Sequence, residues 1–144
     1  MTRHPGCKIC SMPDVTAPED VVFANEHWGV VALQDVPGLL MAFARGHDGG
    51  IGTLSDAAAA ALGPMIRTLS ATLVATGEFE KTSLIYLGDN AIHTHFMLLG
   101  RKPGDAPVFD NTPLLARFAG KDRQRARAIA QTLRDALASS GLTS

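Results

Sequence analysis

The segment from Ile92 to Leu99 most constrains the fold of this chain, because it places two histidines two residues apart in an apolar run. Its residue types are ones that β-strands favour or accept. Side chains alternate between the two faces of a strand, so His93, His95 and Met97 share one face and the apolar residues between them share the other. The pattern predicts a strand that buries one face and holds two imidazoles about 6–7 Å apart. If the chain catalyses a reaction, we expect the reacting groups here.

Short apolar segments bounded by turn residues predict four further strands. These segments are 21–24, 28–33, 39–44 and 82–87. Ser55 is a favourable N-cap for an alanine-rich helix that runs to about Thr76, and Pro64 is expected to kink or divide this helix.

A second, amphipathic helix is predicted near the C-terminus. Its apolar stripe consists of Ala126, Ile129, Ala130, Leu133 and Leu137. We expect its arginines (Arg125, Arg127 and Arg134) to form a solvent face or a subunit contact. Five strands with a long helix between the third and the fourth predict an α+β fold with an antiparallel sheet.

The length of 144 residues fits one domain, 1–144, with a loop-rich N-terminal segment (1–19) and a C-terminal loop and helix (102–144). The formal net charge of −1 gives no overall field that would attract nucleic acid or an anionic membrane. No apolar run is expected to span a membrane, and no signal peptide is evident, so we expect a cytoplasmic protein.

The two cysteines, Cys7 and Cys10, have the C-x2-C spacing of zinc sites and lie too close together to staple a fold. The same spacing also suits a redox dithiol. A closed zinc site needs two further ligands, and the spacing alone does not choose them among the candidates. The candidates are His4, His27, His47 and His93.

The residues His93, His95 and Met97, followed by Arg101, resemble the His-x-His-x-His motif of the histidine triad (HIT) superfamily, with methionine at the third histidine position. The similarity extends from Cys7 to about Arg101. It resembles the zinc-containing branch, whose metal arrangement is shared with galactose-1-phosphate uridylyltransferase. That enzyme also lacks the third histidine.

The resemblance implies a HIT-like five-stranded antiparallel sheet with a long helix and a C-terminal helix. It also implies a structural Zn²⁺ held by four side chains. These are Cys7, Cys10, His47 and His93.

The resemblance further implies a function at a nucleoside α-phosphate. His95 corresponds to the family's nucleophile, which forms a covalent nucleotidyl-histidine that water or an acceptor resolves. Asn90, Met97 and Arg101 are the expected substrate-binding positions. The implied partners are a nucleotide or nucleotide conjugate and a second copy of the chain as a homodimer.

Three features of the sequence depart from the family pattern. Met97 offers only a weak acceptor where relatives place a polar group, and an ionised Asp89 would repel a phosphate. The loop from Gly88 to Ala91 is also short. The alternative function is therefore a nucleotide-binding or interaction module that has kept the fold and lost the chemistry.

Overall fold

The apolar segments form one five-stranded antiparallel sheet in the computed structural model, which describes residues 3–88, 91–105, 107 and 120–142. The strands are β1 (Val21–Ala24), β2 (Trp28–Ala32), β3 (Leu39–Ala44), β4 (Lys81–Ile85) and β5 (His95–Arg101). Their order across the sheet is β1-β2-β3-β5-β4, so β5 lies inside the sheet and β4 at an edge. The α+β class with an antiparallel sheet is confirmed.

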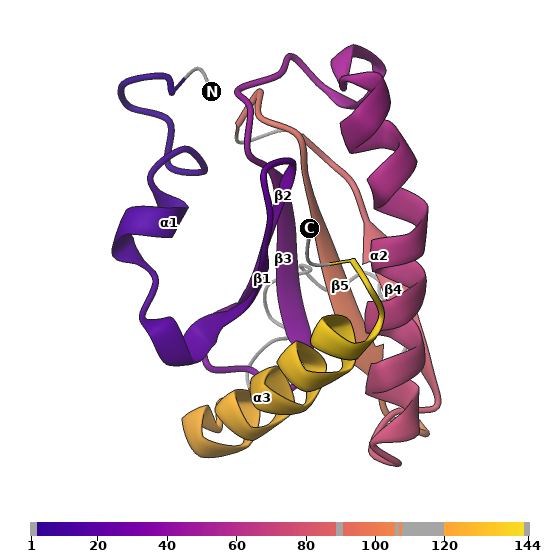
Figure 1. Ribbon diagram of the computed structural model, residues 1–144. Helices are drawn as coiled ribbons and strands as arrows, with labels where there is room; N and C mark the ends of the chain where they lie inside the picture. The colour runs from indigo at the N-terminus through magenta and orange to yellow at the C-terminus, as the bar shows by residue number, and fades with distance from the viewer. Residues whose placement is uncertain (1–2, 89–90, 106, 108–119, 143–144) are drawn as a thin grey trace.

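Helices cover the sheet on one side (Figure 1). The long helix α2 (Asp56–Ala75) and the C-terminal helix α3 (Arg123–Ser139) pack against each other and against the strands. Short turns complete the elements: α1 (Met12–Val15), η1 (Pro18–Asp20) and η2 (Ile51–Thr53). Over 1–19 the sequence predicted only a loop-rich segment and neither α1 nor η1. Helices of three or four residues are too short to show a hydrophobic periodicity.

The main core lies between the sheet and these two helices. Trp28 is completely buried there, and its indole N–H donates to the carbonyl of Ala58 at 2.8 Å, which fixes β2 to the first turn of α2. Phe96 and Leu98 face this core, as the alternation predicted. Every residue of the predicted apolar stripe of α3 is buried.

Ser55 caps α2 as expected, since its hydroxyl accepts from the amide of Ala58 at 3.2 Å. Pro64 lies inside α2 and does not divide it. The helix is held on the C-terminal side of the proline by Met65, Leu69 and Leu73, which are buried against the sheet. Tertiary packing of this kind supplies most helical stability in proteins and outweighs one missing amide donor.

Three strands have boundaries that differ from the expectation: β2 ends one residue earlier, β4 is Lys81–Ile85 instead of 82–87, and β5 is shifted toward the C-terminus. β5 begins at His95 and continues to Arg101, because Arg101 still pairs with Lys81 of β4. His93 lies just before the regular strand, although the backbone of Ala44 still donates to the carbonyl of Thr94 at 3.0 Å.

The opposite face of the sheet is partly covered by the N-terminal segment, which Figure 1 shows beside the strands. Ile9 packs there with Val31 of β2 and Phe43 of β3 in a small buried cluster. Gly29 leaves room for the Phe43 ring, since a Cβ at this position would come within 2.4 Å of it.

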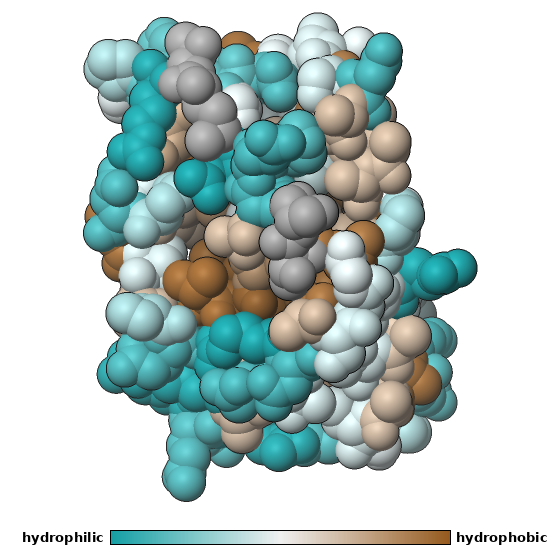
Figure 2. Space-filling view, in the orientation of Figure 1, coloured by the Kyte–Doolittle hydropathy of each residue, from teal (hydrophilic) through white to brown (hydrophobic). Residues whose placement is uncertain are grey.

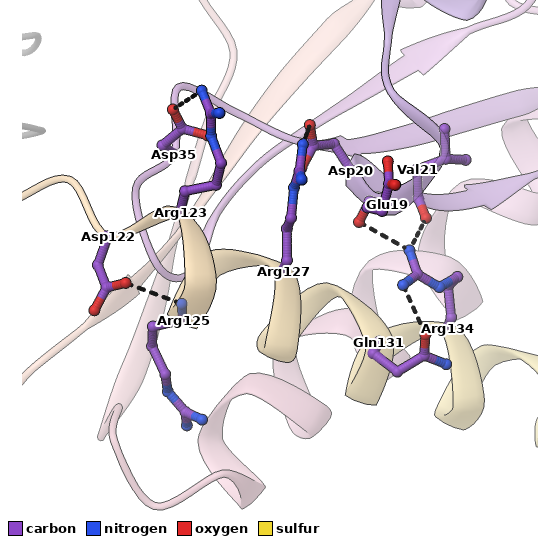
Figure 3. A network of polar contacts seen from close by, with 10 residues as sticks. All are labelled: Glu19, Asp20, Val21, Asp35, Asp122, Arg123, Arg125, Arg127, Gln131 and Arg134. Carbon is purple, nitrogen blue, oxygen red and sulfur yellow. Dashed lines mark hydrogen bonds and ion pairs between the residues drawn. The ribbon is translucent and has the colours of Figure 1, made fainter.

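The arginines of α3 fasten the helix to the rest of the fold instead of forming a bare solvent face (Figure 3). Arg127 forms a two-pronged ion pair with Asp20, with N···O distances of 2.9 and 3.1 Å, and Arg134 donates to the carbonyl of Val21. Arg125 pairs with Glu78, which follows α2.

One helix is long and apolar enough to bear on the expectation about membrane spans. By length and composition α2 could cross a membrane, and it is the single helix of that kind in the described part of the chain. Its alanine-rich surface is pale to light brown in Figure 2, beside the more hydrophilic α3. Its packing through Leu69 and Leu73 is that of a core helix of the sheet.

Candidate metal centre and active site

The two cysteines and two of the histidines converge at one end of the sheet. Cys7 and Cys10 come from the turn before α1, His47 from the loop after β3, and His93 from the residues that lead into β5. One donor atom from each of the four side chains lies within 4.8 Å of the others.

The distances between these donor atoms fit one tetrahedral ion. The Sγ of Cys10 lies 3.3 Å from Nδ1 of His47 and 3.4 Å from Nδ1 of His93, while the Sγ of Cys7 lies 3.5 Å from Nδ1 of His93. Zinc–sulfur bonds of about 2.3 Å and zinc–nitrogen bonds of about 2.0–2.1 Å at tetrahedral angles would separate sulfur from nitrogen by roughly 3.6 Å. The residues present therefore fit a zinc ion.

The protonation states of the site also suit metal binding. The Nε2 of His93 donates to the carbonyl of Ala44 at 2.5 Å, which leaves the Nδ1 lone pair directed at the two sulfurs. Burial lowers the pKa of His93 and so favours the neutral ring that a metal requires. Burial also raises the pKa of the Cys10 thiol, so a cation would be needed to hold its thiolate.

His95 is the first residue of β5 and is half-buried. Its Nδ1 lies 2.6 Å from the carbonyl oxygen of His93. A carbonyl only accepts, so Nδ1 carries the proton and donates it, and the neutral ring keeps its lone pair on Nε2. This tautomer leaves Nε2 as the ring nitrogen with the free lone pair.

The surroundings of His95 on the strand are apolar. Phe43 of β3 lies opposite His95, and two residues further along the strands Met97 lies opposite Met41. Both methionines are half-buried. Neither thioether can donate a hydrogen bond to a phosphate oxygen.

The remaining predicted positions lie elsewhere. Arg101 is six residues from His95 along β5, which is about 20 Å of strand. Its guanidinium is buried, donates to Ser83 at 3.1 Å and lies 3.7 Å from a carboxylate oxygen of Asp105. Asp89 and Asn90 lie outside the described residues.

Sequence reasoning overlooked two groups that orient the site. The carbonyls of Ala44 and His93 fix the tautomers of His93 and His95, and no side-chain pattern signals a backbone acceptor. His4 was considered as a ligand, and its donor atoms lie outside the four-residue cluster.

The fold is that of histidine triad proteins. A HIT-like protein involved in cell-cycle regulation from Bartonella henselae superposes with a TM-score of 0.70 at 10% identity, over 95% of this chain and 100% of that one. A zinc-bound histidine triad family protein from Mycobacterium smegmatis gives 0.66 at 17% identity, over 93% and 94%.

A histidine triad nucleotide-binding protein from Sulfolobus tokodaii gives a TM-score of 0.61 at 15% identity, over 92% and 93% of the two chains. No protein-family model and no curated protein matches the sequence. These likenesses establish the HIT-like fold, and the chemistry must be argued from the residues.

Proposed function

We propose that this protein is a nucleotide phosphohydrolase or nucleotidyltransferase whose nucleophile is His95. The observation that carries the proposal is the hydrogen bond from Nδ1 of His95 to the carbonyl of His93, which leaves Nε2 as the basic nitrogen. Support also comes from the histidine triad fold shared with a nucleotide-binding protein.

The reaction follows from this tautomer. The Nε2 lone pair attacks the α-phosphorus of a nucleotide, an N–P bond forms, and the bond from phosphorus to the leaving group breaks with its electron pair. In the imidazolium that forms, the Nδ1–H still donates its hydrogen bond to the carbonyl of His93, and this bond stabilises the positive charge. Water or an acceptor hydroxyl then attacks phosphorus, a P–O bond forms, and the N–P bond breaks with its electron pair returning to Nε2, so that neutral His95 is released. The proton of the attacking group passes to the departed group or to solvent. Transfer to an acceptor would be a reaction similar to that of galactose-1-phosphate uridylyltransferase.

We propose that Cys7, Cys10, His47 and His93 hold a zinc ion, in line with the zinc-bound relative of the same fold. The ion would supply structure, because all four of its positions are taken by protein side chains. His93 would then bind metal with its ring and orient His95 with its carbonyl. Metal binding would in this way stabilise the backbone that positions the nucleophile.

Substrate contacts are proposed at Asn90 and Met97, which flank His95 in the sequence. Arg101 remains a proposed phosphate contact, although its ion pair with Asp105 and its place at the far end of β5 make a remote part of the substrate the better partner.

One observation favours the alternative function, a nucleotide-binding module without turnover. Met41 and Met97 form an apolar pair next to His95, where a polar group would otherwise stabilise the leaving group. Such a surface suits a base or an apolar moiety better than a phosphate.

A homodimer is also proposed. β4 is an edge strand that pairs only with β5 among the described residues. Three exposed apolar side chains, one within the strand and two just after it, lie along this edge. Leu84 is 49%, Tyr86 41% and Leu87 52% exposed. Edge strands of this kind pair readily with a second chain.

Turnover of a panel of nucleoside polyphosphates, phosphoramidates and nucleotide sugars tests the proposal. We expect release of a nucleoside monophosphate, or its transfer, by the wild type and by His27→Ala. His27 is a matched control, since its ring pairs with Glu26 and lies outside the site. Activity in His95→Ala equal to that of the wild type would exclude His95 as the nucleophile.

A further inference from the structure

His4 lies against the cysteine–histidine cluster without belonging to it. Its imidazole stacks on that of His47, with ring centroids 4.8 Å apart and an angle of 20° between the planes. Its own ring is oriented by Pro5, whose carbonyl oxygen lies 3.1 Å from Nδ1. His4 is exposed whereas His47 is half-buried, so the stacked ring of His4 covers part of one face of the His47 ring.

The backbone of His4 is tied to both cysteines. Its amide lies 3.5 Å from the Sγ of Cys10 and donates to it, and its carbonyl accepts from the amide of Cys7 at 3.1 Å. Burial raises the pKa of the Cys10 thiol, and the hydrogen bond from the His4 amide to its sulfur lowers the pKa by a smaller amount. One residue therefore contacts three of the four proposed ligands.

We propose that His4 is a positioning residue whose ring holds His47 in its ligating orientation and slows the loss of metal. The inference rests on the proposed zinc site. Among the four ligands, His47 lies on a glycine-rich loop, flanked by Gly46, Gly49 and Gly50, whose backbone is not held in a strand. A ring that leaves the metal must swing, and His4 occupies the space on one side of it.

The contribution of the ring differs from that of the backbone. Every residue at position 4 other than proline keeps the backbone N–H that donates to the Sγ of Cys10, and the carbonyl that accepts from the amide of Cys7. A side-chain substitution therefore tests the stacked ring alone. Partners that orient a metal ligand typically contribute about 10–100-fold to metal affinity. An aromatic ring without nitrogen can still stack on an imidazole.

The experiment measures the rate at which a chromogenic chelator in excess removes zinc from the folded protein. The chains compared are the wild type, His4→Ala, His4→Phe and the control His27→Ala. We expect His4→Ala to lose zinc about tenfold faster, and His4→Phe and His27→Ala to stay close to the wild type. Cobalt-substituted wild type and His4→Ala should have the same ligand-field absorption spectrum, because His4 supplies no ligand.

Two results would overturn the inference while leaving the zinc proposal intact. One is equal release from wild type and His4→Ala. The other is a cobalt spectrum that changes in His4→Ala, which would make His4 a ligand. A wild type that binds neither zinc nor cobalt would overturn the zinc proposal itself, and this inference with it.

Discussion

His93 is the residue on which two parts of the site depend. Its ring approaches both cysteine sulfurs within 3.5 Å, and its carbonyl accepts the Nδ1 proton of His95. The ring is anchored in turn by the carbonyl of Ala44 at the end of β3. A change at this residue is therefore expected to disturb both the proposed metal site and the orientation of His95, the proposed nucleophile.

Met97 offers the most direct test of the apolar surroundings of His95. Replacing Met97 by glutamine places a donor beside the nucleophile, so we expect turnover to increase if the enzyme proposal holds. Loss of one such contact in other enzymes costs about 10²–10³ in rate, which sets the upper limit of the gain. Steady-state rates at equal folded fraction are the measurement.

Met97→Leu is the matched control for that prediction, since leucine keeps the position apolar and adds no hydrogen-bond donor. Equal rates for wild type and Met97→Gln would remove position 97 from the proposed chemistry.

At the scale of single residues, the sequence predicted which side chains converge but not how they are oriented. The C-x2-C pair left four histidines open as partners, and only the resemblance selected His47 and His93. The structure brings those two to the cysteines and leaves His27 beside Glu26. Tautomers depend on backbone carbonyls, which lie 49 residues from His93 in the case of Ala44 and cannot be recognised from local spacing.

Among the elements, α3 is attached to the sheet by charge as well as by its apolar stripe. Arg123 forms a two-pronged ion pair with Asp35, with both N···O distances 3.1 Å, and so links the start of α3 to the loop between β2 and β3 (Figure 3). The amide of Asp122 also donates to the carbonyl of Asp35 at 2.8 Å.

This attachment predicts a pH dependence of stability. The hydrogen bonds from Arg123 hold the pKa of the Asp35 carboxyl below its usual value. A carboxyl with a lowered folded-state pKa stabilises the protein above its unfolded pKa of about 3.9, and this contribution is lost as the pH falls through the folded-state pKa. Asp35→Asn should lower the melting temperature slightly at pH 7, and the difference should vanish once the pH falls below the lowered folded-state pKa of Asp35.

Thermal unfolding at a series of pH values measures this difference. Asp135→Asn is the control, because Asp135 lies on α3 like Arg123, and its carboxylate accepts a hydrogen bond from the neutral amide of Gln131. A difference between wild type and Asp35→Asn that is independent of pH would show that charge is not its cause.

Helices and strands were predictable where burial of one face gives the sequence a regular spacing of apolar residues. The stripe of α3 and the burial of Phe96 and Leu98 in β5 were predicted correctly, because each follows from one buried face, whereas Ile92 lies before the strand and is 74% exposed. Strand ends, the undivided α2 around Pro64 and the ion pairs of α3 depend on distant partners such as Lys81, Leu69 and Asp20. Those partners are not visible in a local pattern.

On the scale of the whole molecule, the proposed metal centre joins the N-terminal segment to the sheet. The segment contributes Ile9 to a small core with Val31 and Phe43, and its two cysteines reach the histidines at the end of β3 and β5. The proposed metal would therefore add a second attachment of the segment to the sheet, beside the packing of Ile9.

Removal of metal is therefore expected to destabilise the protein. A metal present at about 1,000 times its Kd adds about 4 kcal/mol, and each kcal/mol shifts the melting temperature by about 2–4 °C in a chain of this size. Chelation, or Cys10→Ser, should lower the melting temperature by on the order of 10 °C. Elemental analysis of protein purified without added metal should find one zinc per chain, and an unchanged melting curve after chelation would contradict the metal proposal.

The measurement that tests the central claim most directly is covalent capture at His95. Wild-type protein mixed with a reactive nucleotide donor and quenched in alkali, where a phosphorus–nitrogen bond at histidine survives, should carry one nucleotidyl group by intact mass. Acid should remove that group, peptide mapping should place it on His95, and His27→Ala should form it as readily as the wild type. An adduct of equal yield in folded His95→Ala, or nucleotide binding by the wild type with neither adduct nor turnover for any donor, would contradict the account.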